Sequence, residues 1–142
     1  NPHQAVIRLE RQPVMNNIKE DFKIEEVDSL GKFLPRSTKK LIISWGFLGT
    51  FLLDKDYLKE YSILIVENID PSNIINKLSS FLQTFEEIVL TEESFINTGI
   101  HSFVASSIAL GTSLIHKYVP SSISEDRFHR STLWGKYNLD LK

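Results

Sequence analysis

The residues with the clearest potential for chemistry lie near the C-terminus, where basic and aromatic side chains alternate. Five of them could form a ligand or nucleic-acid site: Arg127, His129, Arg130, Trp134 and Tyr137. Arginine neutralises phosphate charge and aromatic rings stack on bases, so the pattern is typical of nucleic-acid or phosphate sites. The alternative is structural, with the aromatic rings packing the C-terminal tail against the domain and the charges left in solvent.

Acidic side chains form a second group of candidates, which would bind a basic protein partner. They are Glu20, Asp21, Glu25, Glu26, Asp28, Glu86 and Glu87. An acidic surface attracts a basic partner and accelerates its capture. In the simpler alternative, these carboxylates are only a solvated face of the domain.

No motif indicates catalysis, a metal or a cofactor. The sequence lacks a phosphate-binding glycine loop, a dinucleotide fingerprint and a nucleophile elbow. It has no cysteine, which excludes a thiol nucleophile and a cysteine zinc site. His101 and His116 would lie on different faces of one helix, so we expect no shared metal. We therefore expect no catalytic residue, no metal and no cofactor.

Composition indicates one ordinary globular domain. The chain has 142 residues, 42% of them hydrophobic and 24% charged, which suits a single core. The net charge of −2 argues against a general polyanion binder, so we do not expect nucleic acid as the main partner. Residues 15–142 are the expected domain, because Met15 resembles a native start and residues 1–14 read as a vector-derived or flexible arm. The alternative is that residues 5–9 are a genuine edge strand.

The elements that must position these side chains are clearest in the middle of the chain. Residues 62–69 are a short β-branched run typical of a buried strand. Asp70 and Pro71 then mark a helix start, and apolar residues at helical spacing predict a helix over 71–90. Residues 41–53 are ambiguous, since they fit either a helix or two short strands around Gly46 and Gly49, the interpretation we favour.

A long uncharged stretch predicts a buried helix at the centre of the domain. Residues 96–115 contain no Asp, Glu, Lys or Arg, and large apolar residues such as Phe103 and Leu110 recur along one helical face. We expect a core helix over 95–118, ended by Pro120. A membrane span is the alternative, but the many serines, threonines and glycines make the segment weakly hydrophobic. The predicted fold class is therefore α+β, a small sheet covered by an amphipathic helix and this central helix, with a mostly α bundle as the alternative.

These features lead to a functional expectation from general principles. A small, cysteine-free, mildly acidic domain without a catalytic motif suits a cytoplasmic bacterial protein-binding module that occludes a partner, as immunity proteins and antitoxins do. The first alternative is a nucleic-acid-processing enzyme or subunit that uses the C-terminal cluster. The second is a secretion chaperone or a scaffold subunit that forms a homodimer. No membrane association is expected.

Overall fold

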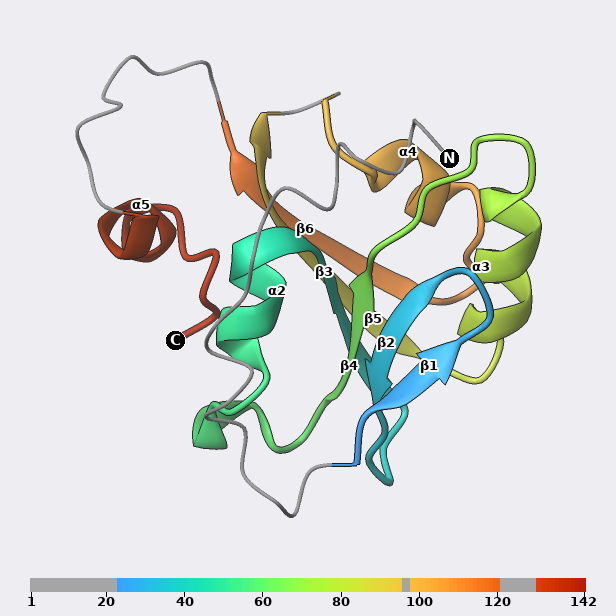
Figure 1. Cartoon of the computed structure of the whole chain (residues 1–142), viewed down its shortest axis with the longest axis horizontal. Coiled ribbons are helices and arrows are strands. Elements are labelled where there is room, and N and C mark those ends of the chain that lie inside the picture. Colours follow the sequence, from blue (N-terminus) through green and yellow to red (C-terminus); the bar gives the residue numbers. More distant parts are fainter. Residues whose placement is uncertain (1–22, 96–97, 121–129) are drawn as a thin grey trace.

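A six-stranded mixed sheet organises the chain (Figure 1). The computed structural model describes residues 23–95, 98–120 and 130–142. The strands are β1 (Glu25–Val27), β2 (Gly31–Leu34), β3 (Lys40–Ser44), β4 (Ser62–Val66), β5 (Glu87–Phe95) and β6 (Ser113–Val119). Their order in the sheet is β1-β2-β4-β3-β5-β6. The strands β4, β3, β5 and β6 run parallel, whereas β2 pairs with β1 and β4 antiparallel.

Helices cover both faces of the sheet. They are α2 (Gly46–Leu52), the 3-10 turn η3 (Asp56–Leu58), α3 (Ile74–Leu82), α4 (His101–Ala105) and α5 (Arg130–Lys136). One core cluster joins the sheet to α3 and α4, and the other joins it to α2, η3 and α5. Figure 1 shows α2 and α5 on one side of the sheet and α3 and α4 on the other. The predicted α+β class is confirmed, and the mostly α alternative is wrong.

The central strands form because both of their faces are buried. All five residues of β4 are buried, and β3 beside it buries Leu41, Ile42 and Ile43. Parallel strands covered by helices on both faces read as continuous β-branched or aliphatic runs, as these do. The strand predicted over 62–69 is confirmed, with its end at Val66.

The helix predicted over 71–90 is real but shorter. Helix α3 buries Ile74, Leu78 and Leu82, one residue per turn, and ends at Leu82. The following apolar residues belong to β5 instead, and Ile88, Val89 and Leu90 are buried on both faces of the sheet. Three consecutive apolar residues suit a strand buried on both sides, whereas a surface helix would expose one of them.

The central helix predicted over 95–118 is wrong. The segment instead contains the end of β5, the short helix α4 and the strand β6. Leu110, expected in the core, is 105% exposed in the loop before β6, while Phe103 packs half-buried against the core. Gly111 adopts a φ of +91°, which ends any helix there. Among the described residues, no helix combines the length and apolar character that a membrane crossing requires.

The ambiguous segment 41–53 is a strand followed by a helix. Ile42 and Ile43 lie in β3, and Leu48 and Leu52 are buried in α2. The favoured interpretation of two strands is therefore wrong for its second half. Gly46 takes a φ of +69°, which lets the chain leave β3 and enter α2 within two residues.

Candidate functional site

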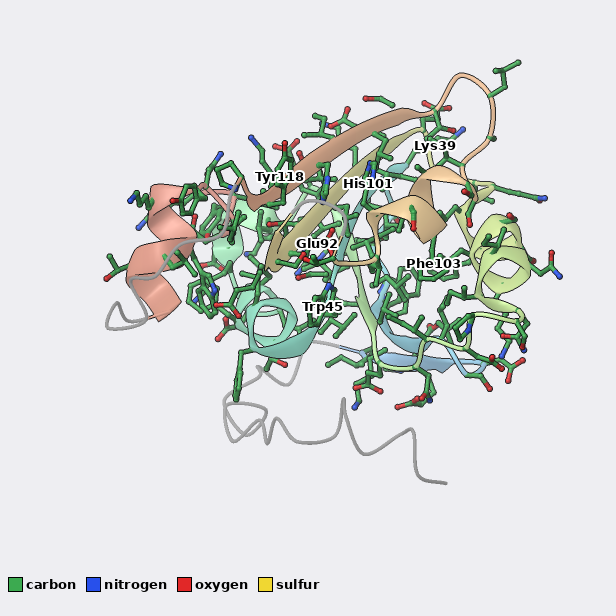
Figure 2. All side chains as sticks on the ribbon, turned by 90° about the horizontal axis from the view of Figure 1, so that it is seen from above. Lys39, Trp45, Glu92, His101, Phe103 and Tyr118 are labelled. Atoms are coloured by element: carbon green, nitrogen blue, oxygen red, sulfur yellow. The ribbon has the colours of Figure 1, made fainter. Side chains whose placement is uncertain are left out.

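The order of the parallel strands changes direction between β3 and β5. Helix α2 leads from β3 to β4 on one side, whereas α3 returns the chain to β5 on the other side of β3. Ligands of open α/β sheets usually bind at such a switch point, beyond the carboxyl ends of the strands. Trp45 follows the end of β3 there, and Glu92 lies next to it on β5. Figure 2 shows these two side chains close together and Lys39 at the opposite end of the sheet.

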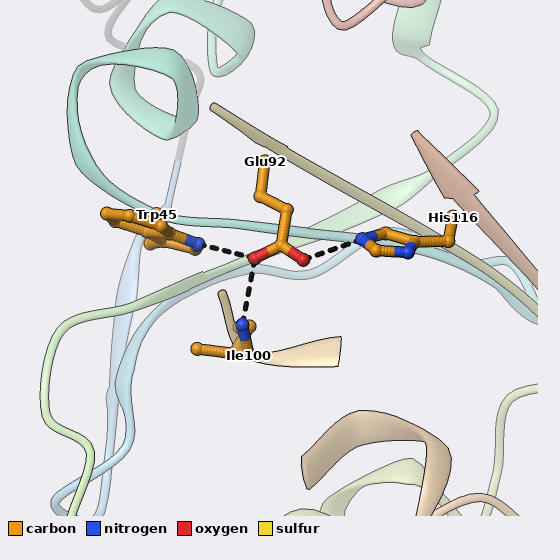
Figure 3. Close-up of polar contacts among 4 residues, drawn as sticks. All are labelled: Trp45, Glu92, Ile100 and His116. Atoms are coloured by element: carbon orange, nitrogen blue, oxygen red, sulfur yellow. Dashed lines mark hydrogen bonds and ion pairs between the residues drawn. The ribbon is translucent and has the colours of Figure 1, made fainter. Parts of the chain in front are cut away.

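Glu92 is the centre of a hydrogen-bonded cluster at this point (Figure 3). Its Oε1 accepts bonds from the Trp45 indole N–H at 3.0 Å and from the Ile100 backbone N–H at 2.9 Å. Its Oε2 lies 2.6 Å from Nε2 of His116, on the adjacent strand β6. Glu92 is 0% exposed. A buried carboxylate requires several donors, and this one has three.

Two histidines that are distant in sequence meet beside this carboxylate. The rings of His101 and His116 stack with centroids 4.3 Å apart, and Tyr118 packs on the His116 ring at 4.5 Å. The pKa of His116 is lowered from its ordinary value, mainly by burial, with a smaller lowering from His101; the hydrogen bond to Glu92 opposes both effects. The neutral imidazole is therefore favoured more than in water, and it donates Nε2–H to Glu92. The prediction that these histidines lie apart is wrong, because they belong to α4 and β6 and not to one helix.

The Glu92 carboxylate at the centre of the cluster is closed to solvent. Gly99 lies directly over the carboxylate, and a Cβ at that position would overlap Glu92 Oε1 and Ser94 Oγ. Stacked imidazole rings direct their in-plane nitrogen lone pairs in parallel and not toward one point. Among the described residues, no group of three His, Asp or Glu side chains could hold a metal ion. The geometry therefore gives Glu92 the role of tying β3, β5, β6 and the start of α4 together.

The other face of β5 uses the same type of bond to hold the C-terminal segment. Glu93 accepts a bond from the Trp134 indole N–H at 2.8 Å, and the Thr91 hydroxyl donates to the Leu139 carbonyl at 2.6 Å. Trp134 also packs against Phe51, with ring centroids 4.7 Å apart. Tyr137 packs half-buried against the same core. These two aromatic residues thus dock α5 on the domain, as in the structural alternative for the C-terminal cluster.

The structure describes only part of the predicted C-terminal cluster. Arg127 and His129 lie outside the described residues, and Arg130 is placed only as the first residue of α5. Trp134 and Tyr137 are described, and both contact the domain as stated above.

The acidic candidates are dispersed. Glu20 and Asp21 lie outside the described residues. Glu25 and Glu26 are exposed on β1, with Asp28 in the turn that follows. Glu86 and Glu87 lie at the start of β5, four strand positions from β1 or ~19 Å at the usual spacing. Exposed Glu86 also pairs with Lys39 at 3.3 Å. The described acids therefore do not form one continuous surface.

The Glu92 cluster was missed because its four members, Glu92 included, come from four separate segments. A sequence signal was nevertheless present: Trp45 and Glu92 each follow closely on an apolar run, and both runs are parallel strands. Polar residues at the ends of adjacent parallel strands meet at one edge of the sheet. Reading residues 71–90 as one helix hid the second of these strands.

A groove lies beside the edge strand β6, on the face covered by α2 and α5. It has a volume of about 380 Å³. Its lining includes Tyr57, Tyr61, Ile115, Lys117 and Leu141. Ile115 is 44% exposed and Tyr57 is 42% exposed, so two large hydrophobic side chains are open to solvent in a groove that also contains polar residues. Exposed hydrophobic side chains with polar neighbours are one feature of protein-contact sites.

Comparison with known proteins shows a fold likeness without a family. No protein-family profile matches the chain, and no curated protein matches it. Among solved structures, one similar chain is described as a split-gene transketolase in an inactive β4 tetramer. The match covers 86% of this chain and 41% of that chain, with a TM-score of 0.59 and 17% identity. This chain thus spans less than half the length of that protein, and the likeness shows the fold alone.

Proposed function

We propose that this chain is a non-catalytic protein-association domain, which holds another protein chain in a multichain assembly. The closed state of Glu92 carries the proposal. The carboxyl ends of the strands at a switch point are where a ligand would ordinarily bind, yet the acid there is 0% exposed and both its oxygens are occupied by protein donors. The exposed hydrophobic side chains of Tyr57 and Ile115 lie instead beside β6.

The form of the proposed assembly is taken by analogy from the protein of similar fold. The similar chain is described as part of a split-gene enzyme and as a β4 tetramer that is inactive. By analogy, the partner of this chain would supply the remainder of a transketolase-like enzyme. The proposal includes a bacterial, cytoplasmic setting.

An occluding role, as in immunity proteins and antitoxins, is a second form of protein binding. It would use the acidic residues, but their dispersal over the described surface favours assembly. A nucleic-acid role gains nothing from Trp134 and Tyr137, since both rings pack on the domain.

The test is native mass spectrometry of the tagged chain purified from its source cell. A double variant, Arg127→Ala with His129→Ala, serves as the control. We expect one stoichiometric protein partner with both baits, which rebinds when purified separately. Ketol-transfer activity should accompany the complex and be absent from the chain alone. A monomer without any partner, or nucleic acid that only the double variant loses, would overturn the proposal.

A further inference from the structure

Among the residues that the structure describes, none pairs with the outer edge of β6. Strand β6 is the last in the sheet, and among the described residues it pairs only with β5. The Ser113 N–H donates to the Glu86 carbonyl, so the backbone N–H and C=O groups of Ser113 point toward β5. Because backbone groups alternate along a strand, Leu114, His116 and Tyr118 direct their N–H and C=O groups to the free edge. An unpaired edge of this kind is a template for an added strand.

The side chains beside this edge differ on the two faces of the sheet. His116 and Tyr118 are held by the Glu92 cluster on the α4 face, so the strand is fixed in position. Ile115 and Lys117 lie on the other face and line the groove. A side chain of an added strand, next to Ile115, would lie at the mouth of this groove.

Lys117 places a positive charge in the groove. Its ammonium has no hydrogen-bond or ion-pair partner among the described residues, and the residue is half-buried. The neighbouring acid, Glu60, is already paired with Lys40 at 3.4 Å. An ammonium without a carboxylate partner among the described residues favours an anionic side chain on the segment that docks there.

We infer that β6 accepts an extended acidic segment of the partner chain, which adds to the sheet as a seventh strand. The segment carries an apolar side chain next to Ile115 and a carboxylate next to Lys117, two residues apart on one face. This inference rests on the proposed association function and names its contact surface. A second copy of β6 fits less well, because β6 contains no acidic residue and antiparallel self-pairing therefore places no β6 carboxylate next to Lys117.

The probe is a nine-residue peptide with leucine and aspartate two positions apart on one face and threonine on the other. NMR on the full chain measures binding and amide exchange. We expect the exchange of the Leu114, His116 and Tyr118 amides to slow by about tenfold or more at saturation. Replacing the aspartate with lysine, or methylating alternate peptide nitrogens, should weaken binding by about tenfold or more. No binding at about 1 mM peptide would overturn the inference.

Two charge-reversal variants provide a matched pair. Lys117→Glu should weaken peptide binding by about tenfold or more, while Lys77→Glu should leave the peptide affinity unchanged. Lys77 also lines a groove, and its ammonium has no hydrogen-bond or ion-pair partner among the described residues, but it lies on α3, on the opposite face. Equal effects of the two variants would overturn the inference, as would protection of the same three amides by self-association without peptide.

The cellular complex separates this inference from the proposed function. If Lys117→Glu and Ile115→Asp both retain the stoichiometric partner, the inference that β6 is the contact surface is wrong and the proposed association function stands. If the wild-type chain has no partner, the association function itself fails.

Discussion

Removing the Glu92 carboxylate tests whether it is a structural tie. In Glu92→Ala, three donors lose their acceptor: the Trp45 indole, the Ile100 backbone N–H and His116 Nε2. Each buried donor without a partner costs about 1–3 kcal/mol. Because the three share one acceptor and their losses are not additive, we expect a total of about 3–5 kcal/mol.

Glu92→Gln separates the charge from the hydrogen bonds. The amide oxygen can still accept the two bonds that Oε1 receives, and a neutral His116 can switch tautomer to accept from the amide nitrogen. The loss is then only the charge-assisted part of the bonds, about 1–2 kcal/mol.

The assay is urea unfolding followed by tryptophan fluorescence. The chain has two tryptophans, and Trp45 and Trp134 each donate to one of the adjacent acids of β5. Glu86→Ala is the control, because this exposed residue should change the free energy of unfolding by less than about 0.5 kcal/mol. A Glu92→Ala protein as stable as this control would refute the structural role of Glu92.

Three further predictions concern packing and pH. Gly99→Ala should destabilise the fold by about 1–3 kcal/mol because the new Cβ overlaps Glu92 Oε1. Gly135→Ala, with open space around the new Cβ, should be neutral or slightly stabilising. Equal melting temperatures of the two variants would contradict this prediction. The pKa of His116 is lower in the folded chain than its ordinary 6.5, so its contribution to stability is complete above about pH 6.5 and is lost as the pH falls through the folded value. His116→Gln should flatten the pH dependence of stability below about pH 6.5. An unchanged slope would show that another group causes this dependence. Leu110 is fully exposed and Leu78 is fully buried. Leu110→Ala should therefore change the free energy of unfolding by less than about 0.5 kcal/mol, whereas Leu78→Ala should lower it by about 2–5 kcal/mol. Denaturant unfolding measures both values.

The sequence predicts best those elements whose pattern has one physical interpretation. The strand at 62–66 is a buried β-branched run, and α3 has an apolar face with one residue per turn, so both were found. Residues 88–90 are buried on both faces of the sheet, and such an apolar run also matches a helical stripe. In 113–119 only Val119 is buried, but Leu114 and Ile115 continue the same helical spacing. Gly99 and Gly111 were the available signal against one long helix.

The candidate site was harder to predict than the fold class. Glu92, Trp45, Ile100 and His116 come together only when β5 is placed between β3 and β6, and no local spacing encodes that order. Trp134 and Tyr137 were easier to predict, since large aromatic side chains gain much from burial.

The most direct test of the account is co-purification of the partner with three forms of the chain: wild type, Glu92→Gln and Lys117→Glu. The measurement is native mass spectrometry at a temperature where circular dichroism shows that all three are folded. The account predicts that wild type and Glu92→Gln retain the stoichiometric partner, because the buried acid supports the fold only, and that Lys117→Glu loses it. Loss of the partner in folded Glu92→Gln with retention in Lys117→Glu would contradict it and place function at the buried acid.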